Sequence, residues 1–232
     1  YGRSIQFISL ISKLFHKTPL KIAAEKSNKE IIDLLLNQQQ MIISDKAFEN
    51  CSFLTKLAIP STVLFIGQQA FRKCASLEGI EINCQIKSIE DGTFSDCCSL
   101  KKIEFPPTVN SIGNSAFQGC SSLTKIVIPP SVISVGNCAF QKCGSLSEIS
   151  IPSSVTSIGS FAFSECSSLK QISIPPSVTV IRESTFSKCA VLSNVSIPQS
   201  VKKIERFAFK DCRLLKEIEI PSSATYSSIS FQ

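Results

Sequence analysis

The sequence contains no tryptophan, only one histidine, and no Cys-x-x-Cys motif among its 11 cysteines. Catalysis by a nucleophile or a general base requires a positioned base and a group that orients it, and His16 has no such constellation near it in the sequence. Structural zinc sites usually show closely spaced ligand pairs, which are missing here. We therefore expect no catalytic site, no metal centre and no cofactor, and we predict that the protein is not an enzyme.

Three further patterns are missing from the chain. No glycine-rich phosphate-binding loop occurs, and no stretch approaches the ~18 apolar residues of a membrane-spanning helix. The net charge of +6 is spread along the chain rather than gathered into a basic patch interleaved with aromatic residues. These absences argue against a small-molecule substrate, a nucleic-acid partner and a transmembrane span in this chain.

The sequence instead contains a repeat of 23 residues that runs without a slip. Each unit is numbered here from its phenylalanine as position zero, and these residues are Phe48, Phe71, Phe94, Phe117, Phe140, Phe163, Phe186 and Phe209. A cysteine follows each phenylalanine three places later, from Cys51 to Cys212, and a leucine follows three places after that. A strict period of this length is typical of a solenoid, in which each repeat is one supersecondary unit stacked on the next.

Each unit contains one predicted strand. Apolar residues at plus nine and plus eleven, such as Ile126 and Ile128, flank a variable residue, which indicates a short strand with one buried face. Proline at plus twelve in seven of the eight units ends the strand, because it lacks a backbone N–H. Glycine at plus nineteen, as at Gly136, predicts a turn with positive φ. The Ala-Phe-x-x-Cys-x-x-Leu segment has the apolar spacing of a short helical turn.

The eight cysteines at plus three, which we call the cysteine ladder, are predicted to be buried free thiols. Equivalent residues of stacked strands lie roughly 5 Å apart with parallel side chains. A disulfide needs Cβ atoms at about 3.5–4.5 Å that point toward each other. Each ladder cysteine is therefore expected to act as a small apolar residue. Cys84, Cys98 and Cys138 lie outside the ladder.

The first forty residues follow a different pattern. Thr18 before Pro19 indicates a helix N-terminus, and residues 31–36 form a second, strongly apolar helix. The segment resembles an ankyrin repeat, although Lys21 and Ser27 replace the histidine and glycine of that family. The residues that match its T-P-L-H-x-A-A core are Thr18, Pro19, Leu20, Ala23 and Ala24. A single ankyrin unit cannot bury both of its faces, so either further repeats lie upstream or residues 1–17 supply a partner helix.

The unit A-F-x-x-C-x-x-L-x-x-I-x-I-P-x-x-V-x-x-I-G resembles the BspA-type leucine-rich repeat over residues 43 to about 221. The resemblance implies an α/β repeat solenoid, leucine-rich-repeat-like, with 23-residue units and a parallel strand ladder, preceded by the α-helical ankyrin-like segment. The predicted domains are an ankyrin-like segment and N-terminal cap at 1–40, a solenoid of about eight units at 41–223 with the last incomplete, and a tail at 224–232. Ankyrin and BspA-type repeats in one chain resemble surface-antigen-like families of parasitic protists.

The residues between the buried strand positions are predicted to point outward and to form an array suited to an extended protein partner. The alternative is a solvated sheet face with no binding role. The candidates at plus eight are Lys56, Lys102, Lys125, Glu148, Gln171, Asn194 and Glu217. The candidates at plus ten are Glu81, Glu104, Val127, Ser150, Ser173 and Ser196. Asn50 and Asn194 also begin N-glycosylation triplets, which matter only in a secreted protein.

The function predicted from these patterns is a non-enzymatic protein–protein interaction solenoid, a cell-surface or adhesion protein that binds a host or cellular protein through its outward strand face. An intracellular ankyrin and leucine-rich-repeat scaffold and the targeting arm of a larger protein are the alternatives. The family resemblance favours the cell surface. The ankyrin-like segment and the free thiols favour a reducing, cytoplasmic compartment.

Overall fold

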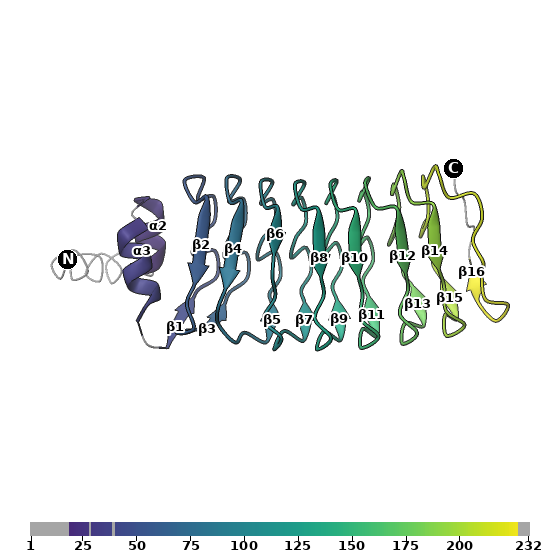
Figure 1. Ribbon diagram of the computed structural model, residues 1–232, viewed down its shortest axis with the longest axis horizontal. Coiled ribbons are helices and arrows are strands. Elements are labelled where there is room, and N and C mark those ends of the chain that lie inside the picture. The colour runs from purple at the N-terminus through teal and green to yellow at the C-terminus, as the bar shows by residue number, and fades with distance from the viewer. Residues whose placement is uncertain (1–18, 28, 39, 227–232) are drawn as a thin grey trace.

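The computed structural model describes residues 19–27, 29–38 and 40–226. The repeats form a parallel β-solenoid of about eight coils, and Figure 1 shows these coils side by side in an elongated row. Two short helices, α2 (Pro19–Glu25) and α3 (Lys29–Leu36), lie at the N-terminal end of the row, where helices were predicted. The predicted partner helix in residues 1–17, together with Thr18 and His16, lies outside the described residues.

Two ladders of short strands run along the solenoid. The first ladder coincides with the predicted strand and comprises β2 (Lys56–Ile59), β4 (Gly79–Ile82), β6 (Lys102–Ile103), β8 (Lys125–Val127), β10 (Glu148–Ser150), β12 (Gln171–Ser173) and β14 (Asn194–Ser196). The second ladder comprises β1 (Met41–Ile43), β3 (Val63–Ile66), β5 (Ser88–Ile89), β7 (Ser111–Ile112), β9 (Ser134–Val135), β11 (Ser157–Ile158), β13 (Val180–Ile181), β15 (Lys203–Ile204) and β16 (Thr225–Tyr226). The predicted parallel ladder is therefore confirmed, and the second ladder was not predicted. Most strands of the second ladder are only two residues long, too short for an alternating pattern to reveal them.

All strand pairs are parallel, and most of their register partners lie one unit apart, as with Ile126 and Ile149. The partners Met41 and Val63, and those of β15 and β16, are one residue closer in the sequence. The paired groups are β2–β4–β6, β8–β10 and β12–β14 in the first ladder, and β1–β3, β5–β7–β9–β11 and β13–β15–β16 in the second. Strand β2 alternates between exposed and buried residues and ends at Ile59, directly before Pro60, as predicted. Ile43 pairs with Ile66, so it occupies the plus-eighteen position of a preceding unit.

The segment around each phenylalanine is a run of turns rather than the predicted helical turn. Residues two places before and two places after the phenylalanine have left-handed backbone conformations in every unit, as in Cys138 (φ 55°) and Lys142 (φ 61°) around Phe140. Alternate N–H groups therefore donate to the following coil, for example Phe140 N–H to Ala162 O at 2.8 Å. Apolar residues spaced by three fit both conformations, so the α/β class was wrong for the repeat, which is built of strands and turns.

The glycines at plus nineteen do not have the positive φ that was predicted. A Cβ at Gly136 would lie 2.6 Å from both Asn114 N and Gly113 C of the preceding coil. Since real Cβ atoms do not approach backbone atoms this closely, the glycine is required because two backbones pass each other at this point. The positive φ values fall instead on residues beside the phenylalanine, most of which carry side chains.

The core is a column of stacked phenylalanine rings. All eight rings are buried, and successive ring centroids lie 5.0 to 5.5 Å apart. This spacing lies in the range of favourable aromatic pairs, so each ring contributes both burial of apolar area and stacking. Each phenylalanine thus packs against its equivalents in the neighbouring coils, which explains why the 23-residue period is strict.

The ladder cysteines are buried, as predicted, and they also donate hydrogen bonds. Seven of the eight donate S–H to the carbonyl of the phenylalanine 26 residues earlier, for example Cys143 Sγ to Phe117 O at 3.1 Å. The same carbonyl accepts the backbone N–H of Cys120 at 3.1 Å. The thiol therefore occupies the second acceptor position of a buried carbonyl. Burial raises the pKa of Cys97 to about 12 and that of Cys166 to about 12.

Candidate functional site

The outward strand face consists of the side chains at plus eight and plus ten of the first ladder and their equivalents in the last unit. All of the candidate residues predicted from the sequence are exposed on this face. The strand alternation is responsible, because it turns residues such as Leu57 and Ile80 into the core and their neighbours toward solvent. Parallel pairing then aligns equivalents along the stack, as with Gln171 beside Asn194.

The chemistry of this face changes along the solenoid. Charged residues dominate the coils from β2 to β10, with lysines at plus eight and glutamates at plus ten in the first coils. Uncharged polar residues follow, namely Ser150, Gln171, Ser173, Asn194 and Ser196. The last unit carries the acidic pair Glu217 and Glu219. Val127, a residue that is 61% exposed, is an isolated apolar residue at plus ten of the first ladder.

Some charges of the first ladder are already paired within the protein. Lys125 Nζ lies 2.8 Å from Glu148 Oε2 in the next coil, and this lysine lowers the pKa of the Glu148 carboxyl group. Lys101, just outside the strand face, likewise pairs with Glu78 at 2.9 Å and lowers its pKa. These exposed ion pairs contribute little to stability. Their charges are less available to a partner than unpaired ones.

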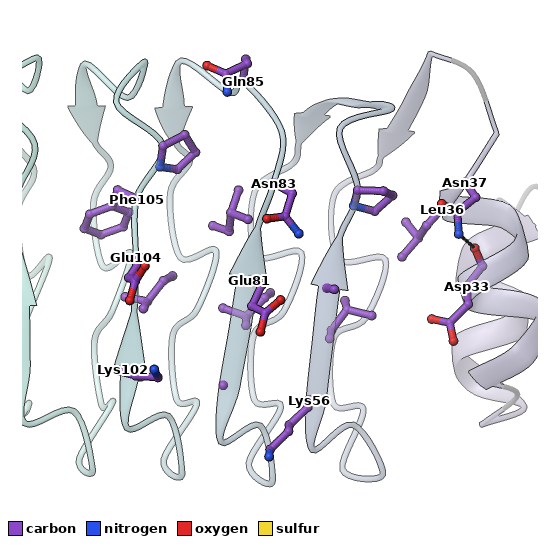
Figure 2. Close-up of a pocket in the computed structure, with 18 of the residues that line it drawn as sticks. Asp33, Leu36, Asn37, Lys56, Glu81, Asn83, Gln85, Lys102, Glu104 and Phe105 are labelled. Carbon is purple, nitrogen blue, oxygen red and sulfur yellow. Dashed lines mark hydrogen bonds between the residues drawn. The ribbon is translucent and has the colours of Figure 1, made fainter.

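The strand face is hollowed into a groove where it meets α3. The groove has a volume of about 1250 Å³ and is lined by α3, by the residue after it, and by β2, β4, β6 and the segments that follow these strands. Figure 2 shows Asp33 and Asn37 on the helix side, facing a strand side that carries Lys56, Glu81 and Lys102. The helix therefore forms one wall of the groove and the first three strands form its floor.

The sequence predicted that Lys56, Glu81, Lys102 and Glu104 on the floor of this groove are exposed, but it gave no indication of the groove or of its wall. Asp33 lies in α3 and Asn37 directly follows it, and the position of this helix beside the strand face depends on tertiary packing, for which the sequence carries no periodic signal. Asn83 and Gln85 were also missed. A signal for Asn83 existed, because it stands at plus twelve in the one unit that lacks proline there. Its N–H donates to Ile59 O at 2.9 Å, which prolongs the β2–β4 pairing.

The part of the chain that the structure describes contains no cluster of histidine, cysteine or acidic side chains that could hold a metal ion. Within the same residues, no helix has the length and apolar character needed to cross a bilayer. Asn50 and Asn194, the asparagines of the glycosylation triplets, are both exposed, and Asn194 lies on the strand face. Cys98 is an exposed thiol.

The BspA type leucine rich repeat region family matches this chain over residues 26–146 and 133–231. A leucine-rich repeat protein from Bacteroides ovatus, whose crystal structure is known, is 39% identical with a TM-score of 0.76. The match covers 80% of this chain and 48% of that protein, so the chain spans about half the length of this relative. A leucine-rich repeat protein from T. pallidum is 30% identical with a TM-score of 0.57, covering 76% of this chain and 72% of that one. No curated protein sequence matches the chain significantly.

These comparisons support the solenoid and not the more detailed assignments. The matched family gives no support for the ankyrin-like assignment of residues 1–40, for which the structure describes only the short helices α2 and α3. Both solved relatives are bacterial proteins, so the likeness to families of parasitic protists is also unsupported. The family match covers far more than half of the sequence, and it agrees with the strand-and-turn repeat described above. The chain belongs to the BspA-type leucine-rich repeat family.

Proposed function

We propose that this protein is a non-enzymatic interaction module that binds a protein partner through its outward strand face. The observation that carries the proposal is the contrast between two sets of positions in each unit. Phenylalanine, cysteine and leucine recur in every unit and are buried in packing. The exposed positions at plus eight and plus ten differ in charge and type from unit to unit, so they are free to specify a partner.

The geometry of the face supports a macromolecular partner. Strands in neighbouring coils are about 4.8 Å apart, and side chains two residues apart along a strand are separated by about 6.6 Å. The array therefore offers an extended grid of side chains rather than a few convergent groups in an enclosed pocket. Such a grid suits a long polypeptide surface better than a small molecule.

The test compares two triple variants of the protein in capture of its partner from cell extracts and surface fractions. The face variant is Lys125→Thr, Glu148→Thr and Gln171→Thr, in which threonine preserves the preference for strand. The control is Lys87→Thr, Asn110→Thr and Lys202→Thr, whose positions stand directly before strands β5, β7 and β15 of the second ladder and are also exposed. Loss of the partner in the face variant alone supports the proposal. Loss in the control variant alone refutes it.

The setting of this module is a second part of the proposal. A cell-surface or adhesion role is the first candidate. The alternative, an intracellular scaffold or the targeting arm of a larger protein, is supported by the exposed thiol of Cys98 and the thiols of the cysteine ladder. An ankyrin-like origin of α2 and α3 would fit this alternative, since Ala23 and Ala24 of α2 and Ile32 and Leu35 of α3 are buried, as in a packed helix pair. Titration of thiols in protein isolated from its natural source separates the two settings, because an oxidised or blocked Cys98 argues against the cytosol.

A further inference from the structure

We propose that the groove beside α3 binds an extended polypeptide segment that carries an acidic and a basic side chain two residues apart. The proposal rests on the function proposed above and identifies both the part of the face that is used and the chemistry of the segment. It depends on three observations: the arrangement of charges on the groove floor, their lack of partners, and the size of the groove.

The floor of the groove presents two rows of opposite charge. At plus eight, Lys56 and Lys102 lie on either side of Gly79, one coil away in each direction. At plus ten, Glu81 and Glu104 lie in neighbouring coils. Figure 2 shows the two carboxylates at one level of the groove and the lysines nearer its lower end. A basic row therefore lies beside an acidic row, across the direction of the strands.

Gly79 opens a space between the two lysines. A Cβ built at this glycine would meet nothing within 4 Å, in contrast to the crowded glycines at plus nineteen. Two strand spacings, about 9.6 Å, separate the backbones that carry Lys56 and Lys102. A carboxylate placed over Gly79 can therefore be approached by both ammonium groups.

The four charges on the floor have no ion-pair partner among the residues that the structure describes. Lys56, Glu81, Lys102 and Glu104 form no salt bridge within that part of the chain, whereas charges outside the groove do. Lys56 makes a small contribution to lowering the pKa of Glu78, but Lys101 is the residue that pairs with this carboxylate. The groove thus concentrates charges that are free to pair with a ligand.

The spacing of the two rows matches one kind of ligand. Side chains at plus eight and plus ten are two residues apart on a strand, about 6.6 Å, and an extended segment presents its residues i and i+2 on one face at the same spacing. A segment that lies along β4 places its acidic side chain over the lysine row and its basic side chain over the glutamate row. The wall formed by α3, with Asp33 and Asn37, borders the segment on one side.

The size of the groove and the balance of its charges favour a polypeptide ligand over a small molecule or a nucleic acid. The groove volume of about 1250 Å³ exceeds the range of roughly 300–1,000 Å³ that is usual for small-molecule sites. Its lining includes Lys29 and Asp33 besides the four floor charges, so lysines and carboxylates are balanced. A nucleic acid or another polyanion requires an excess of positive charge, which this groove does not have.

The first experiment measures binding of labelled synthetic peptides by fluorescence anisotropy. The probe is a nine-residue peptide with Glu-Val-Lys at its centre, flanked by threonine and serine. Its controls carry Glu-Lys as adjacent residues, which point to opposite faces of an extended chain, or Lys-Val-Lys. We expect the Glu-Val-Lys peptide to bind at least about fivefold more tightly than either control, because only this peptide forms charge pairs with both rows. Equal affinity for all three peptides would overturn the proposal.

The second experiment reverses the charge of one row. In the variant Lys56→Glu and Lys102→Glu, all four floor charges are acidic, so we expect about tenfold weaker binding of Glu-Val-Lys and a new preference for Lys-Val-Lys. A misfolded protein would not gain this preference. The control Lys87→Glu, at an exposed position outside both the groove and the outward strand face, should leave the original order of affinities unchanged. A charge-reversed variant that still prefers Glu-Val-Lys refutes the groove as the site.

The outcomes also separate this proposal from the broader one. If the natural partner is lost from the face variant at Lys125, Glu148 and Gln171 but not from the charge-reversed groove variant, the strand face binds elsewhere and the groove proposal fails. If the partner is lost from the charge-reversed groove variant, whether or not the face variant retains it, both proposals are supported. If neither variant loses the partner, both proposals fail. Sedimentation of the wild-type chain and of the charge-reversed variant tests a further outcome. If the wild-type chain is a dimer and the variant Lys56→Glu and Lys102→Glu is a monomer, the groove binds a second copy of the chain instead of a free segment.

Discussion

At the residue scale, neighbouring coils approach each other closely at the glycines of plus nineteen. We expect Gly136→Ala to lower the free energy of unfolding by about 2–3 kcal/mol, because its Cβ would collide with backbone atoms of the preceding coil. The matched control is Gly79→Ala, where the Cβ enters open space. Because alanine loses less conformational entropy on folding than glycine, we expect this variant to have a free energy of unfolding about 0.5–1 kcal/mol higher than the parent. Urea titration measures both variants. Unfolding midpoints that shift equally would show that the coils do not need glycine for their approach.

A second residue-scale prediction concerns the cysteine ladder. Cys143→Asp places a carboxylate among buried apolar groups and removes the donor to Phe117 O, so we expect a loss of several kcal/mol. Cys143→Ala removes only the thiol and should cost about 1–2 kcal/mol. The exposed Cys98→Asp serves as the control and should leave the melting temperature within about 2 °C of the parent. Equal melting temperatures for all three variants would contradict the buried ladder.

At the scale of elements, the ladder of thiols predicts a loss of stability in alkali. Burial holds the pKa of Cys97, Cys166 and Cys212 at about 12 in the folded protein. A thiol in the unfolded chain has a pKa of about 8.5. The folded pKa is raised, so this contribution to stability is complete below about pH 8.5 and is lost as pH rises toward about 12. Each thiol contributes a slope of up to about 1.4 kcal/mol per pH unit.

The measurement is urea unfolding between pH 7 and about 10.5, a range that covers the ionisation of unfolded thiols. We expect the free energy of unfolding to fall steeply above about pH 8.5. The variant Cys120→Ala, Cys143→Ala and Cys166→Ala should be less stable at neutral pH but show a shallower fall. A slope that the triple variant leaves unchanged would assign the alkaline loss to other groups.

The elements also show which parts of the fold the sequence can predict. The first ladder was predictable because buried and exposed residues alternate over plus eight to plus eleven, and because proline marks its end. The turns around Phe140 were not predictable from spacing, since residues such as Cys138 and Lys142 give no sign of a left-handed backbone. The glycines were recognised as special, but their role depends on a neighbouring coil that is 23 residues away in the sequence.

At the scale of the whole molecule, the candidate site combines the outward strand face, which follows from the local sequence, with α3, which is brought beside it by tertiary packing. The outward face follows from strand alternation, so the sequence predicted Lys56, Glu81 and Lys102 correctly as exposed residues. The groove requires α3 to stand beside the first strands, which depends on packing between the helices and the first coil. One contact of this packing is the hydrogen bond from Thr62 Oγ1 to Leu36 O at 2.7 Å.

The solenoid as a whole should tolerate the loss of a complete unit better than the gain of a single residue. Deleting residues 141–163 joins Phe140 to Ser164 and restores the spacing of phenylalanine and cysteine. Since the coils contact mainly their neighbours, we expect this variant to fold and to unfold at a somewhat lower urea concentration than the parent. Insertion of one residue between Pro152 and Val155 shifts the second ladder against the column of phenylalanines on both sides, so we expect it to unfold at a much lower urea concentration. Circular dichroism at increasing urea concentration measures the stability of both variants. An insertion variant that is as stable as the parent, or more stable than the deletion variant, would contradict a stack held in register by every unit.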